Sequence, residues 1–303
     1  MTKEEGVGQR DWLERTLVRL VLEAPENRLP DAADQPIFNA PVLGIANGDD
    51  PLFETFLAAV SHRHLRPRAF LERHAPAGTD LTRVRVVAWA LPFTEAVRSS
   101  NRTGDWPSQL YSLARNHGGA LTVELGRRLA RSIEARGYAA VSPALTDAYG
   151  AFRDPNHVFS STWSERHAAY AAGLGFFGLN GALITPLGIN VRLGSLMTNL
   201  PVEGPARPPR ADHRAACLED GGAACGRCVE RCPVGAISGG GLDKVKCNGM
   251  RKAVQDGSRS SGTASALLFA SLQIVNGCKS WRYPLGCALC QCGVPCEGSD
   301  PFV

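Results

Sequence analysis

The sequence predicts a protein of the mixed α/β (α+β) class, with a layered N-terminal domain and a smaller C-terminal domain. Segments of helical periodicity alternate with short apolar runs up to about residue 200, as in domains whose helices cover a sheet. The composition changes to proline, arginine and glycine at 201–214, as is common between domains. All ten cysteines follow, within 217–296. We therefore expect domains at 1–205 and 206–303.

The N-terminal segment interleaves charged and apolar residues at helical spacing, which predicts an amphipathic helix within residues 1–30 and no export leader. No apolar run reaches the roughly 18 residues that a membrane span needs. We expect a cytoplasmic protein that makes no membrane contact. The net charge of +4 is modest and shows no run of like charges, so nucleic acid is not an expected partner.

The remaining elements follow from periodicity and from glycine or proline boundaries. Gly118 and Gly119 are a possible break in the longest helix, and Gly137 is its expected stop. His62, His64 and His74 stand among arginines, which predicts a solvated face. The expected helices are 50–65, 109–138 and 164–173, and the expected strands are 38–46, 83–93, 138–145, 181–186 and 191–201, the last two around a turn.

The first cysteine group resembles the C-x2-C-x2-C-x3-C-P run of bacterial ferredoxins, with the first interval lengthened from two residues to seven. A disulfide scaffold would require a small secreted chain. Zinc would need four ligands rather than eight, and its sites rarely end in C-x3-C-P. Iron–sulfur ligation is therefore the predicted role of the group Cys217-x7-Cys225-x2-Cys228-x3-Cys232-Pro233.

A second, more widely spaced group completes two predicted [4Fe–4S] clusters. By the crossed ligation of two-cluster ferredoxins, the fourth cysteine of the first run serves the other cluster. The expected ligands are Cys217, Cys225, Cys228 and Cys296 for the first cluster and Cys232, Cys247, Cys287 and Cys290 for the second. Cys278 and Cys292 are left over. Cys292 competes with Cys296 for the last position, and Pro295 with its returning loop favours Cys296.

Residues 173–178 match G-x-G-x-x-G, but a dinucleotide site needs a strand before the loop and a helix after it. Here the expected order is reversed, and no acidic residue stands near position 198. Two interpretations remain. Gly173 and Gly175 either close a helix and a tight turn, or let the chain approach another cofactor.

Four segments together resemble epoxyqueuosine reductase and its relatives: SERHAAYAAGLGFFGLNGALITPLG, NVRLGSLMTNLP, CGRCVERCPVGAI and GCALCQCGVPCE. The resemblance implies a nitroreductase-like N-terminal domain that binds cobalamin and a ferredoxin-like domain that binds two clusters. Reductive dehalogenases share this two-part plan. Electrons would pass from an external donor of the ferredoxin or flavodoxin type through the clusters to cobalamin, which would reduce a small or medium organic substrate.

The chain departs from that family at several positions. The family's proton-donating aspartate precedes the Glu-Arg pair, where this chain has Phe159 or Ser160; the nearest carboxylates are Asp147 and Asp154. The lysine after the glycine loop is Leu179, and the chain stops at Val303, before any tRNA-binding helical repeat. We therefore leave the catalytic residues unassigned and expect a substrate other than tRNA epoxyqueuosine.

Three polar residues near the glycine loop are candidates for cofactor binding. Arg166 could bind an anionic group or form a surface salt bridge. Asn180 could bond a cofactor amide or adopt a left-handed turn conformation. Arg192 could point into a polar site or into solvent. Two other functions stay open: an electron-transfer protein without catalysis, and a corrinoid-handling protein without substrate reduction.

Overall fold

The computed structural model describes residues 3–29, 32–155, 158–205, 207, 212–220, 222, 224–260 and 286–302, with the backbone alone for 3–7 and 255–260. Cys278 lies outside the described residues. No helix in these ranges combines the length and the apolar character needed to cross a membrane.

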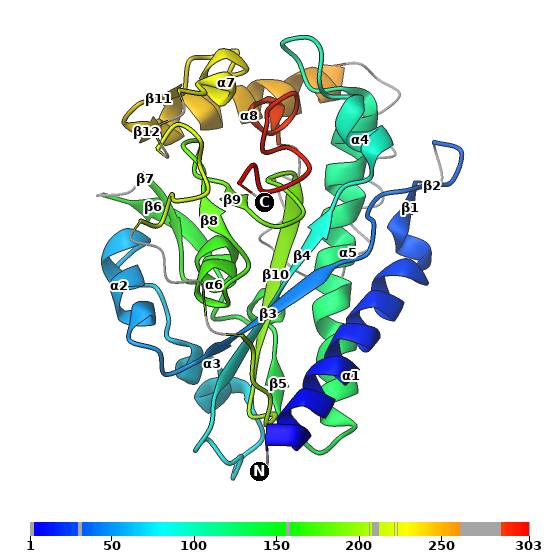
Figure 1. Cartoon of the computed structure of the whole chain (residues 1–303), viewed down its shortest axis with the longest axis vertical. Helices are drawn as coiled ribbons and strands as arrows, with labels where there is room; N and C mark the ends of the chain where they lie inside the picture. The colour runs from blue at the N-terminus through cyan, green and yellow to red at the C-terminus, as the bar shows by residue number, and fades with distance from the viewer. Residues whose placement is uncertain are drawn as a thin grey trace.

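A four-stranded sheet of order β3-β4-β10-β5 forms the centre of the molecule, and all its neighbouring strands are antiparallel (Figure 1). Its strands are β3 (Val42–Asn47), β4 (Arg85–Pro92), β5 (Ala140–Val141) and β10 (Val191–Thr198). Successive side chains of β4 enter two different cores, with Val87 and Trp89 on one face and Val86 and Ala88 on the other. Burial on both faces explains why β4 is an almost continuous apolar run.

Helices cover both faces of this sheet, which confirms the expected mixture of helix and sheet in layers. On one face lie α1 (Lys3–Leu22) and α5 (Gln109–Glu134). On the other lie α2 (Leu52–Ala59), α3 (Pro67–His74) and α6 (Glu165–Ala171). The described chain also contains η1 (Pro25–Asn27), β1 (Arg28–Leu29), β2 (Gln35–Pro36), α4 (Glu95–Ser99) and η2 (Pro143–Leu145).

The two glycines in the middle of α5 do not break it. A Cβ at Gly118 would lie 2.5 Å from the Phe38 ring, so the glycine allows the loop before β3 to pack closely on the helix. Gly137 follows the end of α5 with φ +83°, a conformation that glycine adopts without strain. The expected stop is confirmed, and the expected break is wrong because close packing, not a turn, requires the glycine.

Strand pairing differs from the expectation around residue 187. The expected strands 181–186 and 191–201 do not pair with each other. Instead β9 (Leu183–Ile184) pairs with β8 (Phe176–Phe177), whereas β10 enters the central sheet. A further hairpin of β6 (Ala151–Asp154) and β7 (Val158–Ser161) was not predicted.

The histidine segment is not uniformly solvated. His64 is buried and stacks on Trp163, and its Nε2 accepts a hydrogen bond from the backbone N–H of Ser164. Burial lowers the pKa of His64 to about 4, so the ring is neutral. The predicted solvated face is therefore wrong for His64, although His62 is exposed as expected.

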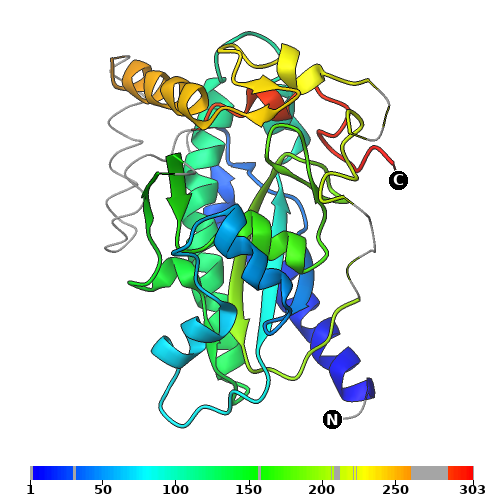
Figure 2. The ribbon, with the colours of Figure 1, turned by 90° about the vertical axis from the view of Figure 1, so that its left-hand side faces the viewer.

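The cysteine-bearing segments lie at one end of the sheet, at the top of Figures 1 and 2 and opposite the N-terminus. They contain α7 (Arg227–Glu230), β11 (Ile237–Ser238), β12 (Gly241–Leu242), α8 (Lys244–Ser260) and η4 (Leu289–Gln291). Met250, Val254 and Cys292 join the core that α1 and α5 form with the sheet. A separate small core packs this region on the β8–β9 hairpin through Phe176 and Ile184.

Candidate metal centres and the adjoining cavity

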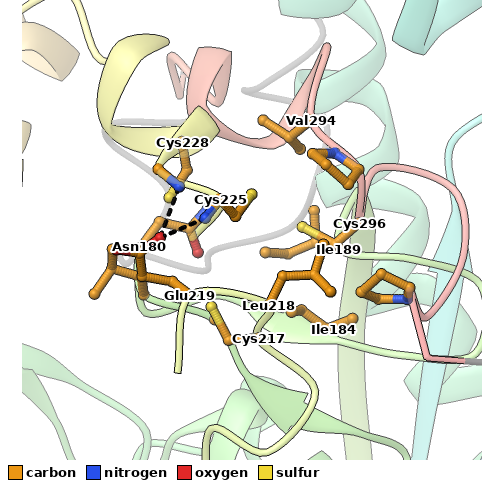
Figure 3. Close-up of a pocket in the computed structure, with 15 residues that line it drawn as sticks. Asn180, Ile184, Ile189, Cys217, Leu218, Glu219, Cys225, Cys228, Val294 and Cys296 are labelled. Carbon is orange, nitrogen blue, oxygen red and sulfur yellow. Dashed lines mark hydrogen bonds between the residues drawn. The ribbon is translucent and has the colours of Figure 1, made fainter. Parts of the chain in front are cut away.

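Four cysteines from three separate segments line one apolar pocket (Figure 3). The rest of its wall includes Ile184 and Ile189, which follow the glycine loop, and Val294 near the C-terminus. The four thiols are those that crossed ligation assigns to the first cluster: Cys217, Cys225, Cys228 and Cys296.

Backbone hydrogen bonds hold these cysteines in place. The Glu219 carboxylate accepts from the N–H groups of Cys225 and Gly226 at 2.7 and 2.8 Å, as the dashed lines in Figure 3 show. Gly226 has φ +57°, which lets the chain turn into α7. The Cys296 carbonyl accepts from the N–H of Ile189 at 2.7 Å, which joins the last cysteine to the N-terminal part of the chain.

The other four predicted ligands line a second pocket of about 340 Å³. They are Cys232, Cys247, Cys287 and Cys290. Asn180 lines both cysteine pockets, and its side chain donates to the Cys290 carbonyl at 3.0 Å and accepts from the N–H of Ala182 at 3.1 Å. The left-handed residue of this turn is Gly181, with φ +71°, and not Asn180. Asn180 therefore ties the segment that carries Cys290 to the turn before β9.

Cys292 lies in a different environment. It is fully buried in the main core, lines neither cysteine pocket, and accepts a hydrogen bond from the Asn190 side chain at 2.8 Å. Its thiol is therefore already used in packing. Among the described residues, no three histidine, cysteine, aspartate or glutamate side chains are arranged to hold a single metal ion.

The cysteine pockets disfavour free thiolates. Burial, together with the neighbouring thiols, raises the pKa of Cys228 to about 11 and that of Cys296 to about 12. Apolar surroundings stabilise the neutral thiol, so thiolates would require a strong positive charge at the centre of the pocket. An iron–sulfur core supplies such charge.

A third cavity, also of about 340 Å³, lies against the sheet between α5, α6 and β10. It shares four lining residues with the second cysteine pocket, so the two spaces adjoin: Arg115, Arg166, Ala182 and Gln291. Trp89 and Leu193 contribute apolar surface, and Ser142 and Ser195 contribute hydroxyl groups. We call it the sheet cavity.

Three arginines line the sheet cavity. Arg166 donates to the Gly181 carbonyl, and Arg192 donates to the Arg115 carbonyl at 2.7 Å. None of the three takes part in an ion pair within the described part of the chain. Burial, and then the charge of Arg115, lowers the pKa of Arg192 to about 9. Arg166 and Arg192 thus both line a cavity, which agrees with the interpretation of each as a residue of a polar site.

Glu165 is a site residue that the sequence did not single out. It contributes the one carboxyl group among the described residues lining the sheet cavity and the second cysteine pocket. Ser195 donates to its Oε2 at 2.6 Å, and Trp163 donates to the Ser195 hydroxyl at 3.0 Å. Burial raises the pKa of Glu165 to about 7. The signal in the sequence that could have identified Glu165 is its position next to Arg166, which was already a candidate for the site.

The glycine loop closes α6 and packs on β9. Gly173 follows the helix with φ +75°, and the N–H of Leu174 returns to the Ala169 carbonyl. Gly175 has φ +156°, and a Cβ there would lie 2.0 Å from the Ile184 carbonyl oxygen. Neither glycine lines the three cavities, and a cofactor contact for them stays a prediction. The order of helix, loop and strand is as expected.

No family model matches the chain. Over 86 residues it is 40% identical to the epoxyqueuosine reductase of Bacillus cereus, covering 28% of this chain and 20% of that protein. Over 92 residues it is 41% identical to the epoxyqueuosine reductase of Staphylococcus aureus, covering 30% of this chain and 22% of that protein. The match thus spans about a fifth of each relative's length. Over these segments the expected resemblance to epoxyqueuosine reductases is confirmed.

The solved structures that resemble this chain have lower sequence identity to it than the relatives above. A crystal structure of epoxyqueuosine reductase with an epoxyqueuosine-modified tRNA-Tyr stem loop has a TM-score of 0.49 and 17% identity, covering 95% of this chain and 67% of that chain. A reductive dehalogenase structure, described with a mechanism for B12-dependent dehalogenation, has a TM-score of 0.43 and 17% identity, covering 79% and 35%.

Proposed function

We propose that this protein is a reductase in which two [4Fe–4S] clusters deliver electrons to a bound cobalamin that reduces an organic substrate. One observation carries the proposal: eight cysteines gather in two sets of four, and the second set adjoins a polar cavity on the sheet. The local identity to proteins named epoxyqueuosine reductase supports it. The proposal includes a nitroreductase-like domain at 1–205 and a ferredoxin-like domain at 206–303.

The cysteine sets suit clusters rather than single ions. Each set has four cysteines lining one pocket, and four thiolates are the number that a [4Fe–4S] cluster requires. Cys296 rather than Cys292 completes the first set, because only Cys296 lines the pocket. When bound, the clusters supply one-electron transfer from an external donor.

The sheet cavity and the second pocket offer groups that suit a corrinoid. Arginine, serine and glutamine side chains can bond its amides, and the cations can balance its phosphate. Arg166 and Arg192 are the proposed contacts in the sheet cavity, with Asn180 beside the second pocket. When bound, cobalamin would supply a strongly reducing cobalt for the reaction.

The proposed substrate is a small or medium organic molecule rather than tRNA epoxyqueuosine. Phe159 lines the second pocket and cannot donate a proton, and the Ser160 hydroxyl donates to the Val60 carbonyl. Asp154 accepts a hydrogen bond from Ser61 and is not among the residues lining the three cavities, and Asp147 is exposed. Glu165 is therefore the group best placed to hold a proton at the sheet cavity, oriented by Ser195.

The test is iron and cobalt content in one anaerobically purified sample, after incubation with hydroxocobalamin and desalting. We expect about eight irons and about one cobalt per chain. The same iron without cobalt would reject the cobalamin proposal and favour an electron-transfer protein. Cobalt retention with no reduction of any substrate in a screen would favour corrinoid handling.

A further inference from the structure

Three guanidinium groups from three different elements meet at the sheet cavity: Arg115 of α5, Arg166 of α6 and Arg192 of β10. The Nε atoms of Arg115 and Arg192 are buried and have no hydrogen-bond partner among the described residues. Glu165 is the one carboxyl group at this cavity in the described chain, and one of its oxygens accepts a hydrogen bond from Ser195. The cavity wall therefore has a net positive charge.

Arg115 and Arg192 are half-buried and Arg166 is exposed. A guanidinium whose Nε is shielded from water, as in Arg115 and Arg192, is stabilised when an opposite charge lies close to it. The second cysteine pocket is lined by Arg115 and Arg166 but not by Arg192. An anionic cluster held by those cysteines would balance the first two arginines. Arg192 would still face the sheet cavity, where no cysteine stands among the described lining residues. An anion in the sheet cavity would give the Arg192 Nε the partner that it lacks among the described residues.

We propose that the sheet cavity binds the carboxylate or phosphate group of a small organic anion, with Arg192 and Arg115 as its ligands. This inference rests on the proposed function, since it names the class of substrate, and it assigns Arg192 to that substrate rather than to the corrinoid. The volume of about 340 Å³ lies within the ~300–1,000 Å³ typical of small-molecule pockets. The remainder of the ligand would lie against Trp89, Val191 and Leu193, which give the cavity an apolar side.

The same arginines could instead hold the phosphate of a bound corrinoid, and the experiment separates these sources. Isothermal titration calorimetry with benzoate and inorganic phosphate is run on iron-loaded protein, with and without hydroxocobalamin. Benzamide, which has the shape of benzoate without its charge, is the matched ligand control. We expect at least one anion to bind in both forms of the protein, and benzamide to bind at least tenfold more weakly than benzoate.

Arg192→Gln should weaken anion binding at least tenfold, because it removes the charge. Arg73→Gln, at an exposed position on α3, should leave binding unchanged. Iron content checks that each variant is folded. If Arg192→Gln loses its iron, the benzoate–benzamide comparison on the natural protein still decides.

Three results would overturn the inference: no anion binding, equal binding of benzoate and benzamide, or binding that hydroxocobalamin abolishes. The last would assign the arginines to the corrinoid. Failure of the proposed function would show separately, as missing iron or cobalt in the same samples.

Discussion

Cys292 and Cys296 are four positions apart in the sequence, and their surroundings separate them. Cys296 lines the first cysteine pocket, whereas Cys292 is buried in the main core and bonded by Asn190. Spacing alone left both open as the last ligand, because a returning loop can present either thiol.

Replacing Cys296 by serine should remove about half of roughly eight irons, since one cluster loses a ligand. Cys292→Ser is the matched control and should keep the full iron content, with some loss of stability from the altered core. Anaerobic iron analysis and electron paramagnetic resonance of the reduced protein measure both. The opposite pattern would reassign the ligand to Cys292.

Glu165 gives a pH-dependent prediction. Its pKa is about 7 in the folded protein and near 4.5 in the unfolded chain, so the folded state holds its proton over a range where the unfolded state has released it. Stability from this group is therefore fully present below pH ~4.5 and falls as the pH rises towards 7, by at most about 1.4 kcal/mol per pH unit.

Glu165→Gln should remove this dependence, so the variant should become more stable relative to the natural protein between pH 5 and 7. Denaturant unfolding of iron-loaded protein at several pH values provides the measurement. Glu72→Gln, at an exposed position on α3, serves as control. If both variants follow the natural pH profile, Glu165 does not carry a raised pKa.

At the scale of elements, the G-x-G-x-x-G segment is a helix end followed by a hairpin. Its glycine spacing matched a dinucleotide loop, but the order of its neighbouring elements excluded that interpretation from the sequence alone. What the sequence could not reveal is that Gly175 lies against the backbone of Ile184, because strand pairing brings the two together.

Gly175→Ala should destabilise the protein by about 2 kcal/mol or more, because a side chain must enter an unfavourable backbone region and collide with a carbonyl oxygen. At Gly150 a Cβ would have no atom within 4 Å, so Gly150→Ala is the control and should change stability by less than about 1 kcal/mol. Thermal unfolding decides. Equal midpoints for the two variants would contradict the argument.

At the scale of the whole molecule, the cysteine region and the β8–β9 hairpin form one packing unit. Phe176, Ile184 and Ile189 share a core with Cys217 and Val294. The N–H of Ile189 donates to the Cys296 carbonyl, and a Cβ at Gly188 would lie 2.3 Å from the Glu297 carbonyl oxygen. Loss of a cluster should therefore lower local stability on both sides of the expected domain boundary.

Removing iron with a chelator should increase amide hydrogen exchange in residues 286–302 and also in 176–190, because metal binding is coupled to folding of its ligands. The centre of β4 should stay protected, since it is paired with strands on both sides and buried on both faces of the sheet. Exchange followed by mass spectrometry measures this. An effect confined to 286–302 would indicate independent units.

The mixed class, the main helices, β4, β10 and the cysteine pattern could be predicted without the structure, because these features depend on local periodicity and short spacing. The sequence also offered Arg166 and Arg192 as candidates for a polar site, with a surface position as the alternative. Tertiary contacts were needed to see that Cys296 and not Cys292 lines the first pocket, that His64 is buried, and that Glu165 faces the sheet cavity. These properties arise where segments distant in sequence meet, and a side chain's burial and charge partners are set by those contacts.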